Sequence, residues 1–201
     1  MESETSSFSS AENSIPLKIA VLGQSMVGKS ALTFRFINNK FPKEHDTTIE
    51  DAYSIPAKID DTPCQLEILD TAGQDDYQTM LDTWINSAEG FILVYSIDNK
   101  ESFESVKKKY ERILKLKSQH KFSIVLAGNK CDLEENRQVN REEVENFCHS
   151  NKITFLETSA LKTINVKEIF LYIARGLLQI KFPNKYKGNE SESKKKRCYC
   201  F

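Results

Sequence analysis

The chain has 201 residues and a formal net charge of −1, with 39% apolar and 28% charged residues. These proportions are those of an ordinary globular domain and lack the positive excess of a nucleic-acid-binding protein. No apolar run approaches about 18 residues, the length needed to cross a bilayer, so we expect any membrane contact to be peripheral. The five cysteines show no zinc-like spacing and follow no signal peptide, which predicts a reduced, intracellular protein.

The composition divides the chain into three parts. Residues 1–15 are Ser-rich and acidic with few apolar side chains to bury, which predicts a flexible arm. Residues 16–182 carry the apolar periodicity of one folded domain, and we expect residues 183–201 to form a flexible basic tail.

Within the predicted domain, short apolar runs typical of buried strands occur at 17–22, 64–69, 90–96, 122–128 and 153–156. Helical spacing is found at 29–39 and 101–118, and again from Val166 to Leu177. Residues 49–59 precede the turn-rich DDTP and the second run, which predicts an antiparallel hairpin at a sheet edge. Strands that alternate with helices predict an α/β fold with a mostly parallel sheet and helices on both of its faces.

The first strand leads into a G-x-x-x-x-G-K-S motif. A loop that runs into a helix start presents backbone N–H groups and the positive end of the helix dipole to an anion. We expect Lys29 to reach the β- and γ-phosphates of a nucleotide and Ser30 to ligate Mg²⁺. The motif predicts the P-loop NTPase fold but leaves ATP and GTP open. The five apolar runs and the segment 49–59 predict six strands, of which one edge strand is antiparallel. The candidate phosphate-binding residues are Gly23, Gln24, Ser25, Met26, Val27, Gly28, Lys29, Ser30 and Ala31.

Two later stretches favour guanine over adenine. Asp132 in NKCDL follows the strand at 122–128, and a carboxylate there accepts hydrogen bonds from both N1–H and N2–H₂ of guanine. Adenine has no such donor pair and would leave the carboxylate unpaired, which argues against an ATP-using enzyme. We expect Asn129 and Lys130 to brace the loops and the ring, and Ser159 and Ala160 to offer backbone N–H groups to the guanine carbonyl.

The stretch LDTAGQ ends the strand at 64–69. Asp70 at this strand end fits a carboxylate that holds Mg²⁺ directly or through water. Gly73 would offer its N–H to the γ-phosphate, and Gln74 is placed to orient the attacking water. Thr71 and Ala72 complete this candidate segment.

The motifs GQSMVGKS, FPKEHDTTIEDAY, DTAGQDDY, NKCDL and ETSA resemble those of the Ras family of small GTPases, over residues 17–181 and again in the tail. The resemblance implies a switch that hydrolyses GTP to GDP, with Phe41 stacked on guanine and Thr48 binding Mg²⁺ and the γ-phosphate. It also implies a monomer that works with an exchange factor, a GTPase-activating protein and effectors, and not with nucleic acid. The implied effector-binding residues are Thr48, Ile49, Glu50, Asp51, Ala52 and Tyr53.

Several positions depart from the family pattern. Ser25 and Met26 stand where the family has small glycines, and a side chain at Ser25 crowds the space where a partner's arginine and a glutamine meet the transition state. His45 and Thr47 replace the usual tyrosine and proline of the first switch, which leaves the choice of effector open. Leu161 replaces a lysine, which predicts a slightly rearranged guanine loop.

The chain ends in KKKRCYCF. Cys198 lies four residues from the end, the spacing of a prenylation signal, and a terminal Phe favours a geranylgeranyl group. One lipid binds membranes weakly, but the four cations at 194–197 would strengthen binding to an anionic surface. We therefore expect a lipid-anchored protein on the cytoplasmic face of a membrane, the plasma membrane being the favoured one.

Two functions remain open at this point. The leading hypothesis is a GTPase switch that uses Mg²⁺ and hydrolyses GTP slowly, with Lys29 stabilising charge and Gln74 placing water. The alternative is an adaptor that stays GTP-bound and acts by effector binding alone. Gln74 favours the first and Ser25 the second.

Overall fold

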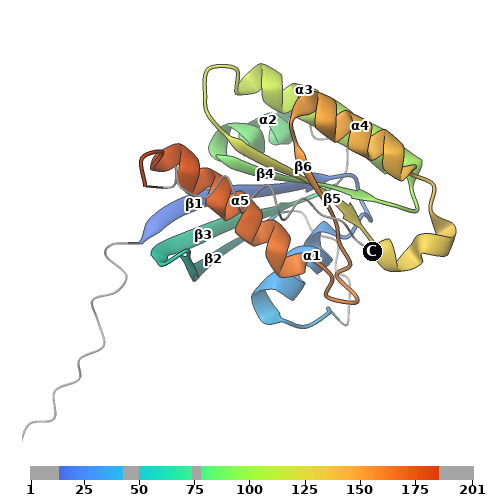
Figure 1. Ribbon diagram of the computed structural model, residues 1–201, viewed down its shortest axis with the longest axis horizontal. Helices are drawn as coiled ribbons and strands as arrows, with labels where there is room; N and C mark the ends of the chain where they lie inside the picture. The colour runs from blue at the N-terminus through green and yellow to red at the C-terminus, as the bar shows by residue number, and fades with distance from the viewer. Residues whose placement is uncertain (1–13, 43–49, 74–77, 186–201) are drawn as a thin grey trace, which may run out of the picture.

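The computed structural model describes residues 14–42, 50–73 and 78–185 as a sheet covered by helices (Figure 1). The strands are β1 (Ile15–Gly23), β2 (Glu50–Ile59), β3 (Thr62–Thr71), β4 (Gly90–Ser96), β5 (Ser123–Asn129) and β6 (Thr154–Glu157). The helices are α1 (Lys29–Asn38), α2 (Gln78–Ser87), α3 (Lys100–Leu116), the 3₁₀ helix η1 (Cys131–Asn136), α4 (Arg141–Asn151) and α5 (Val166–Lys181). The strand order is β2-β3-β1-β4-β5-β6, with β2 antiparallel and the other pairs parallel, so the predicted fold class is confirmed.

Helices cover both faces of this sheet. In Figure 1, α1 and α5 lie on one face, and α2, α3 and α4 lie on the other. Helices are needed on both faces because a parallel sheet has apolar side chains on each side. Within the described residues, no helix is both long enough and apolar enough to cross a membrane.

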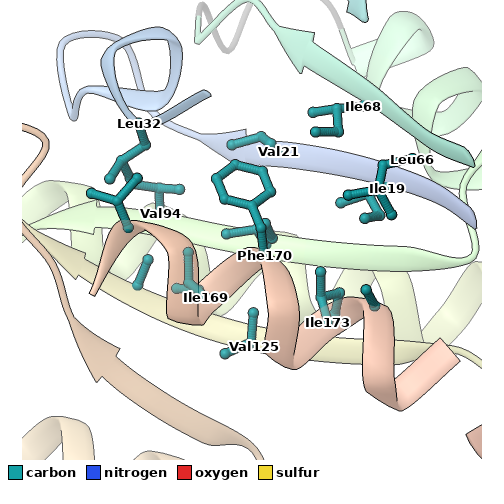
Figure 2. Close-up of a cluster of buried hydrophobic side chains, with 14 of the residues drawn as sticks. Ile19, Val21, Leu32, Leu66, Ile68, Val94, Val125, Ile169, Phe170 and Ile173 are labelled. Atoms are coloured by element: carbon teal, nitrogen blue, oxygen red, sulfur yellow. The ribbon is translucent and has the colours of Figure 1, made fainter. Parts of the chain in front are cut away.

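Strand β1 illustrates how two apolar cores arise from one sequence. Leu17, Ile19 and Val21 belong to the core under α1 and α5, whereas Ala20 and Leu22 belong to the core under α2 and α3. Alternate residues of a strand point to opposite faces, so a continuous apolar run fills both cores. Figure 2 shows the first core, in which Phe170 and Ile173 of α5 lie against the side chains of the central strands.

The expected hairpin at the sheet edge is formed by β2 and β3. Its two-residue turn consists of Asp60 (φ 45°) and Asp61 (φ 64°), and Ile59 pairs with Thr62 on either side of it. Two successive left-handed residues give a turn whose twist matches that of the strands. Pro56 is tolerated within β2 because an edge strand leaves one side without ladder hydrogen bonds.

Helices α2 and α4 are not among the helices predicted from the sequence. Each buries only a short apolar stripe; in α4 the fully buried residues are Val144 and Cys148. Asn140 caps α4 by accepting a hydrogen bond from Glu142 N at 2.8 Å. An Asn followed three residues later by Glu143 is a helix-start signal that the sequence does contain.

The loop between β1 and α1 is held in an unusual backbone conformation. Met26 has φ 66° and Gly28 has φ 91°, both in the left-handed region. Glycine adopts this region without penalty, but a side chain there costs about 1–2 kcal/mol. The Met26 side chain is 84% exposed, so it recovers little of this cost by packing.

We therefore predict that Met26→Gly raises the free energy of unfolding by about 0.5–1 kcal/mol, the relieved strain less the added entropy of the unfolded chain. Urea unfolding at equal protein and ligand concentrations measures the change. Ser25→Gly is the matched control in the same loop, because Ser25 has no left-handed φ and should lose a few tenths of a kcal/mol instead. Equal effects of both substitutions would contradict the strain at Met26.

Candidate nucleotide-binding site

The polar motifs of the sequence meet at one edge of the sheet. The loop 24–28 follows β1, Asp70 lies next to the end of β3, Asn129 ends β5, and the loop 158–161 follows β6. These strands are parallel, so their carboxyl ends lie at the same edge, where ligands of such sheets bind. The tertiary structure thereby brings together segments that are more than 100 residues apart in the chain.

The start of α1 is arranged to receive an anion. Gly28 is its N-cap residue, so the N-cap has no side chain with which to cap the helix. The buried Lys29 extends back over the loop and donates from Nζ to the Gln24 carbonyl at 3.0 Å. Val27 and Ala31 pack into the core, which fixes the loop to the domain. The backbone N–H groups of a helix start and a buried ammonium are features that bind phosphate.

The side chain of Asn129 connects the phosphate loop to the base-binding side. Its Nδ2 donates to the Val27 carbonyl at 2.8 Å, and its Oδ1 accepts from the Thr158 hydroxyl at 3.2 Å. A Cβ on Gly28 would lie 2.4 Å from Nδ2 of Asn129, so this close approach requires glycine. One buried amide thus fixes the distance between the two halves of the site.

The loop after β6 holds the carboxylate expected to bind guanine. The Ser159 hydroxyl donates to Oδ1 of Asp132, which orients that carboxylate. The Ser159 N–H, however, donates to the Ile164 carbonyl at 3.0 Å. Of the two N–H groups expected to bind the guanine carbonyl, that of Ser159 is therefore already used, and that of Ala160 is left as the donor.

A charged cluster that supports this loop was missed by sequence reasoning. Glu157 is only 6% exposed and pairs with Arg137 at 2.9 Å and also with Arg141. Arg137 in turn forms an ion pair with Glu134 of η1, so the segments around Asp132 and Ser159 are tied together. A charged residue at the end of a buried strand is the signal that could have revealed the cluster.

Lys130 lies beside the phosphate loop. Its Nζ is 3.9 Å from Oδ2 of Asp98, and both residues line a cavity of about 500 Å³ that also includes Met26 and Val27. Lys130 has φ 61°, which turns the chain sharply between β5 and η1.

Asp70 provides a test of whether the residues fit a magnesium ion. Its side chain is fully buried, and neither carboxylate oxygen accepts a hydrogen bond in standard geometry from a described residue. Burial raises the pKa of this carboxyl to about 6, the nearby Ser30 hydroxyl and Lys29 ammonium oppose the shift, and Asp51 adds to it. A buried carboxylate is stabilised by a cation, and oxygen ligands are those that Mg²⁺ prefers. Ser30 and Asp70 therefore fit the ion.

The segment after Asp70 lies tightly against the phosphate loop. A Cβ on Gly73 would come within 2.2 Å of the Ser25 backbone nitrogen, so a larger residue at this position would displace the loop. The Thr71 hydroxyl donates to the Val21 carbonyl at 2.9 Å and fastens β3 to β1. Ala72 and Gly73 also line a cavity of about 650 Å³ between α2 and α3.

The described part of the expected effector segment lies on the edge strand. Glu50, Asp51 and Ala52 are exposed and Tyr53 is half-buried, as a surface for partners requires. Trp84 of α2 donates from Nε1 to Glu50 Oε2 at 2.8 Å, a contact between α2 and the expected effector segment that sequence reasoning missed.

Several expected site residues lie outside the described residues. They are His45, Thr47, Thr48, Ile49, Gln74 and Cys198, so their roles stay predictions. Phe41 is described and packs against the core beside α1.

Comparison with known proteins agrees with this geometry. The Ras family model matches residues 18–179. The chain is 44% identical to Ras-like protein rasB of Dictyostelium discoideum over 178 residues, 89% of each chain. It is 42% identical to Ras-related protein R-Ras of Mus musculus over 160 residues (80% of this chain, 73% of the relative), and 40% identical to that of Rattus norvegicus over 185 residues (91% and 85%). The chain therefore belongs to the Ras family and is a small GTPase that acts as a signalling switch.

Proposed function

We propose that this protein binds GTP with Mg²⁺, hydrolyses it slowly to GDP and phosphate, and changes its affinity for effectors as it does so. The observation that carries the proposal is the meeting, at one sheet edge, of a helix start with glycine as its N-cap, the buried Asp70 carboxylate and the oriented Asp132 carboxylate. These groups suit a triphosphate, a divalent cation and a guanine base respectively.

In the proposed reaction, water attacks the γ-phosphorus, the bond from that phosphorus to the bridging oxygen breaks, and GDP leaves. Lys29 and the backbone N–H groups at the start of α1 stabilise the charge on the phosphate oxygens. Gln74 orients the water. Ser30, Thr48 and Asp70 would hold Mg²⁺, which would supply positive charge to offset that of the phosphates.

Loss of the γ-phosphate would release the two switch segments. Gly73 would lose its contact with the departing phosphate, and the close approach of its backbone to the phosphate loop at Ser25 supports this role. Thr48 would be released together with it. In proteins of this kind, the γ-phosphate orders such segments and its loss releases them. This change exposes or withdraws the effector surface. Exchange factors, activating proteins and effectors are the partners that this cycle requires.

Guanine selectivity is the first prediction. The carboxylate of Asp132 accepts from two donors of the base, whereas an asparagine amide offers one acceptor and donors that oppose N1–H and N2–H₂. Asp132→Asn should therefore weaken GTP binding by at least about 100-fold. It should bind xanthosine triphosphate better than the parent does, because xanthine has a carbonyl where guanine has an amine.

Competition calorimetry with GTP, ATP and xanthosine triphosphate measures the affinities of the parent and of Asp132→Asn for each nucleotide. Asp60→Asn is the matched control, since Asp60 lies on the β2–β3 turn and pairs with Arg175. ATP that competes as well as GTP with the parent protein would overturn the proposed function.

The rate of hydrolysis separates a switch from an adaptor. We predict measurable phosphate release over hours from purified, GTP-loaded protein, and weak stimulation by an activating protein because of the Ser25 side chain. Ser25→Gly should restore stimulation by about tenfold or more, since a partner's arginine accelerates the reaction by about 10³–10⁵ when unobstructed.

Single-turnover hydrolysis with and without a Ras-family activating protein measures both effects, and Ser25→Ala provides an intermediate side chain. Release no faster than the blank would favour the GTP-bound adaptor. Equal stimulation of parent and Ser25→Gly would end the argument from crowding.

The C-terminal tail supports a proposal about location. We propose that Cys198 is prenylated and that the lipid, together with the basic residues 194–197, anchors the protein to the cytoplasmic face of the plasma membrane. Mass spectrometry of the cellular protein should find a lipidated terminus, and Cys198→Ser should move the protein into the soluble fraction. An unmodified chain that ends at Phe201 would rule this out.

A further inference from the structure

Arg35 on α1 contacts the base-binding loop through its guanidinium group. Its Nε donates to the Ala160 carbonyl at 2.8 Å, and one of its terminal nitrogens donates to the Leu161 carbonyl at 3.0 Å. The other terminal nitrogen donates to the Asn39 carbonyl at 3.3 Å, at the end of its own helix. Two successive carbonyls of the loop are thus held by one planar group.

This contact fixes the part of the loop that faces the base. Ala160 supplies the N–H left for the guanine carbonyl, because the N–H of Ser159 is used by Ile164. The peptide planes on either side of the Ala160 α-carbon carry that N–H and the carbonyl held by Arg35. A fork of fixed geometry restricts how the chain rotates there, which a single flexible donor would not do.

Arg35 also lies beside the aromatic residue implied to stack on guanine. The guanidinium carbon is 5.8 Å from the centroid of the Phe41 ring, within reach of a cation–π interaction. The same side chain therefore touches two groups on the base side of the site.

The helix that carries Arg35 begins at the phosphate loop. Arg35 lies six residues after Lys29, about 9 Å along the helix axis at 1.5 Å per residue. A rigid helix consequently links the phosphate-binding end to the loop that holds the base. Opening of that loop, a prerequisite for the nucleotide to leave, would have to break both hydrogen bonds to Arg35.

We propose that Arg35 is a positioning residue that slows the release of the bound guanine nucleotide by holding the 160–161 carbonyls and Phe41 in place. The inference rests on the proposed function, because it assumes that the loop holds guanine. It assigns to Arg35 a role in nucleotide retention, beyond that of a residue that caps its own helix through Asn39.

The test is the dissociation rate of a fluorescent GDP analogue from the Mg²⁺-loaded, full-length protein, after addition of excess unlabelled GDP. We expect Arg35→Gln to release the analogue about tenfold faster, since two charge-assisted hydrogen bonds are lost and such losses act mainly on the rate of dissociation. Arg35→Lys keeps the charge but has no fork, so its rate should lie between those of the parent and the Gln variant.

Arg175→Gln is the matched control. Arg175 also forms a two-point contact, to Asp60 at 2.8 and 2.9 Å, but on the distant hairpin turn. The Arg175→Gln variant should release the GDP analogue at a rate within about twofold of the parent, because surface ion pairs contribute little to stability.

A second ligand distinguishes positioning of the base loop from general loosening of α1. In 6-thioguanosine diphosphate a sulfur, which is a weak acceptor, replaces the carbonyl oxygen that Ala160 would bind. Competition should show that Arg35→Gln weakens binding of this ligand by a smaller factor than it weakens GDP. Equal factors for both ligands, or unchanged GDP release from Arg35→Gln, would overturn the inference.

The result for the parent separates this inference from the proposed function. If the parent retains no GDP, the proposed function fails. If the parent retains GDP and the Arg35 variants release it at the parent rate, the role of Arg35 alone fails. Should Arg35→Gln not fold, Arg35→Lys gives the same comparison, and a parent-like rate there also overturns the role.

Discussion

The site depends on one buried side chain. The amide of Asn129 links the phosphate loop to the loop that follows β6. Its donor binds the Val27 carbonyl, and its acceptor receives the Thr158 hydroxyl. Both ends lie within the protein, where a broken hydrogen bond leaves an unsatisfied group and costs about 1–3 kcal/mol. The two halves of the site therefore keep one spacing, which a ligand with a base at one end and phosphates at the other requires.

Two residues of the same region lower the stability of the folded protein. Among the described residues, none donates a hydrogen bond of standard geometry to the buried Asp70 carboxylate. Met26 is held in the left-handed region although it is not glycine. Costs of this kind persist when the rest of the fold over-determines the local structure, and they gather where ligands bind. At Asp70 a cation would remove the cost, whereas at Met26 the loop retains it.

Around this centre, polar and charged side chains connect α2 to its neighbours and support the base loop. Trp84 joins α2 to the edge strand through Glu50, and Arg112 of α3 pairs with Asp82 of α2. Glu157 and its two arginines hold the base loop from the side of η1 and α4. The base loop thus has ionic support from η1 and α4, while α2 is held by Trp84 and Ile85, which are buried in the core under α2 and α3.

The sequence by itself determined the fold class and the chemistry of the loops, because these depend on local patterns. Continuous apolar runs, glycines at fixed offsets in the phosphate loop and Asp132 after a strand can be recognised from the sequence without knowledge of any tertiary contact. The tertiary structure alone decided the partners: that Asn129 reaches Val27, that the Ser159 N–H is taken by Ile164, and that Arg35 meets Ala160 across 125 residues. Helices α2 and α4 also depend on the tertiary structure. Their apolar stripes are short, so these helices are stabilised mainly by packing against the sheet. Such contacts join residues distant in the chain, and their geometry is set only when strands and helices pack together.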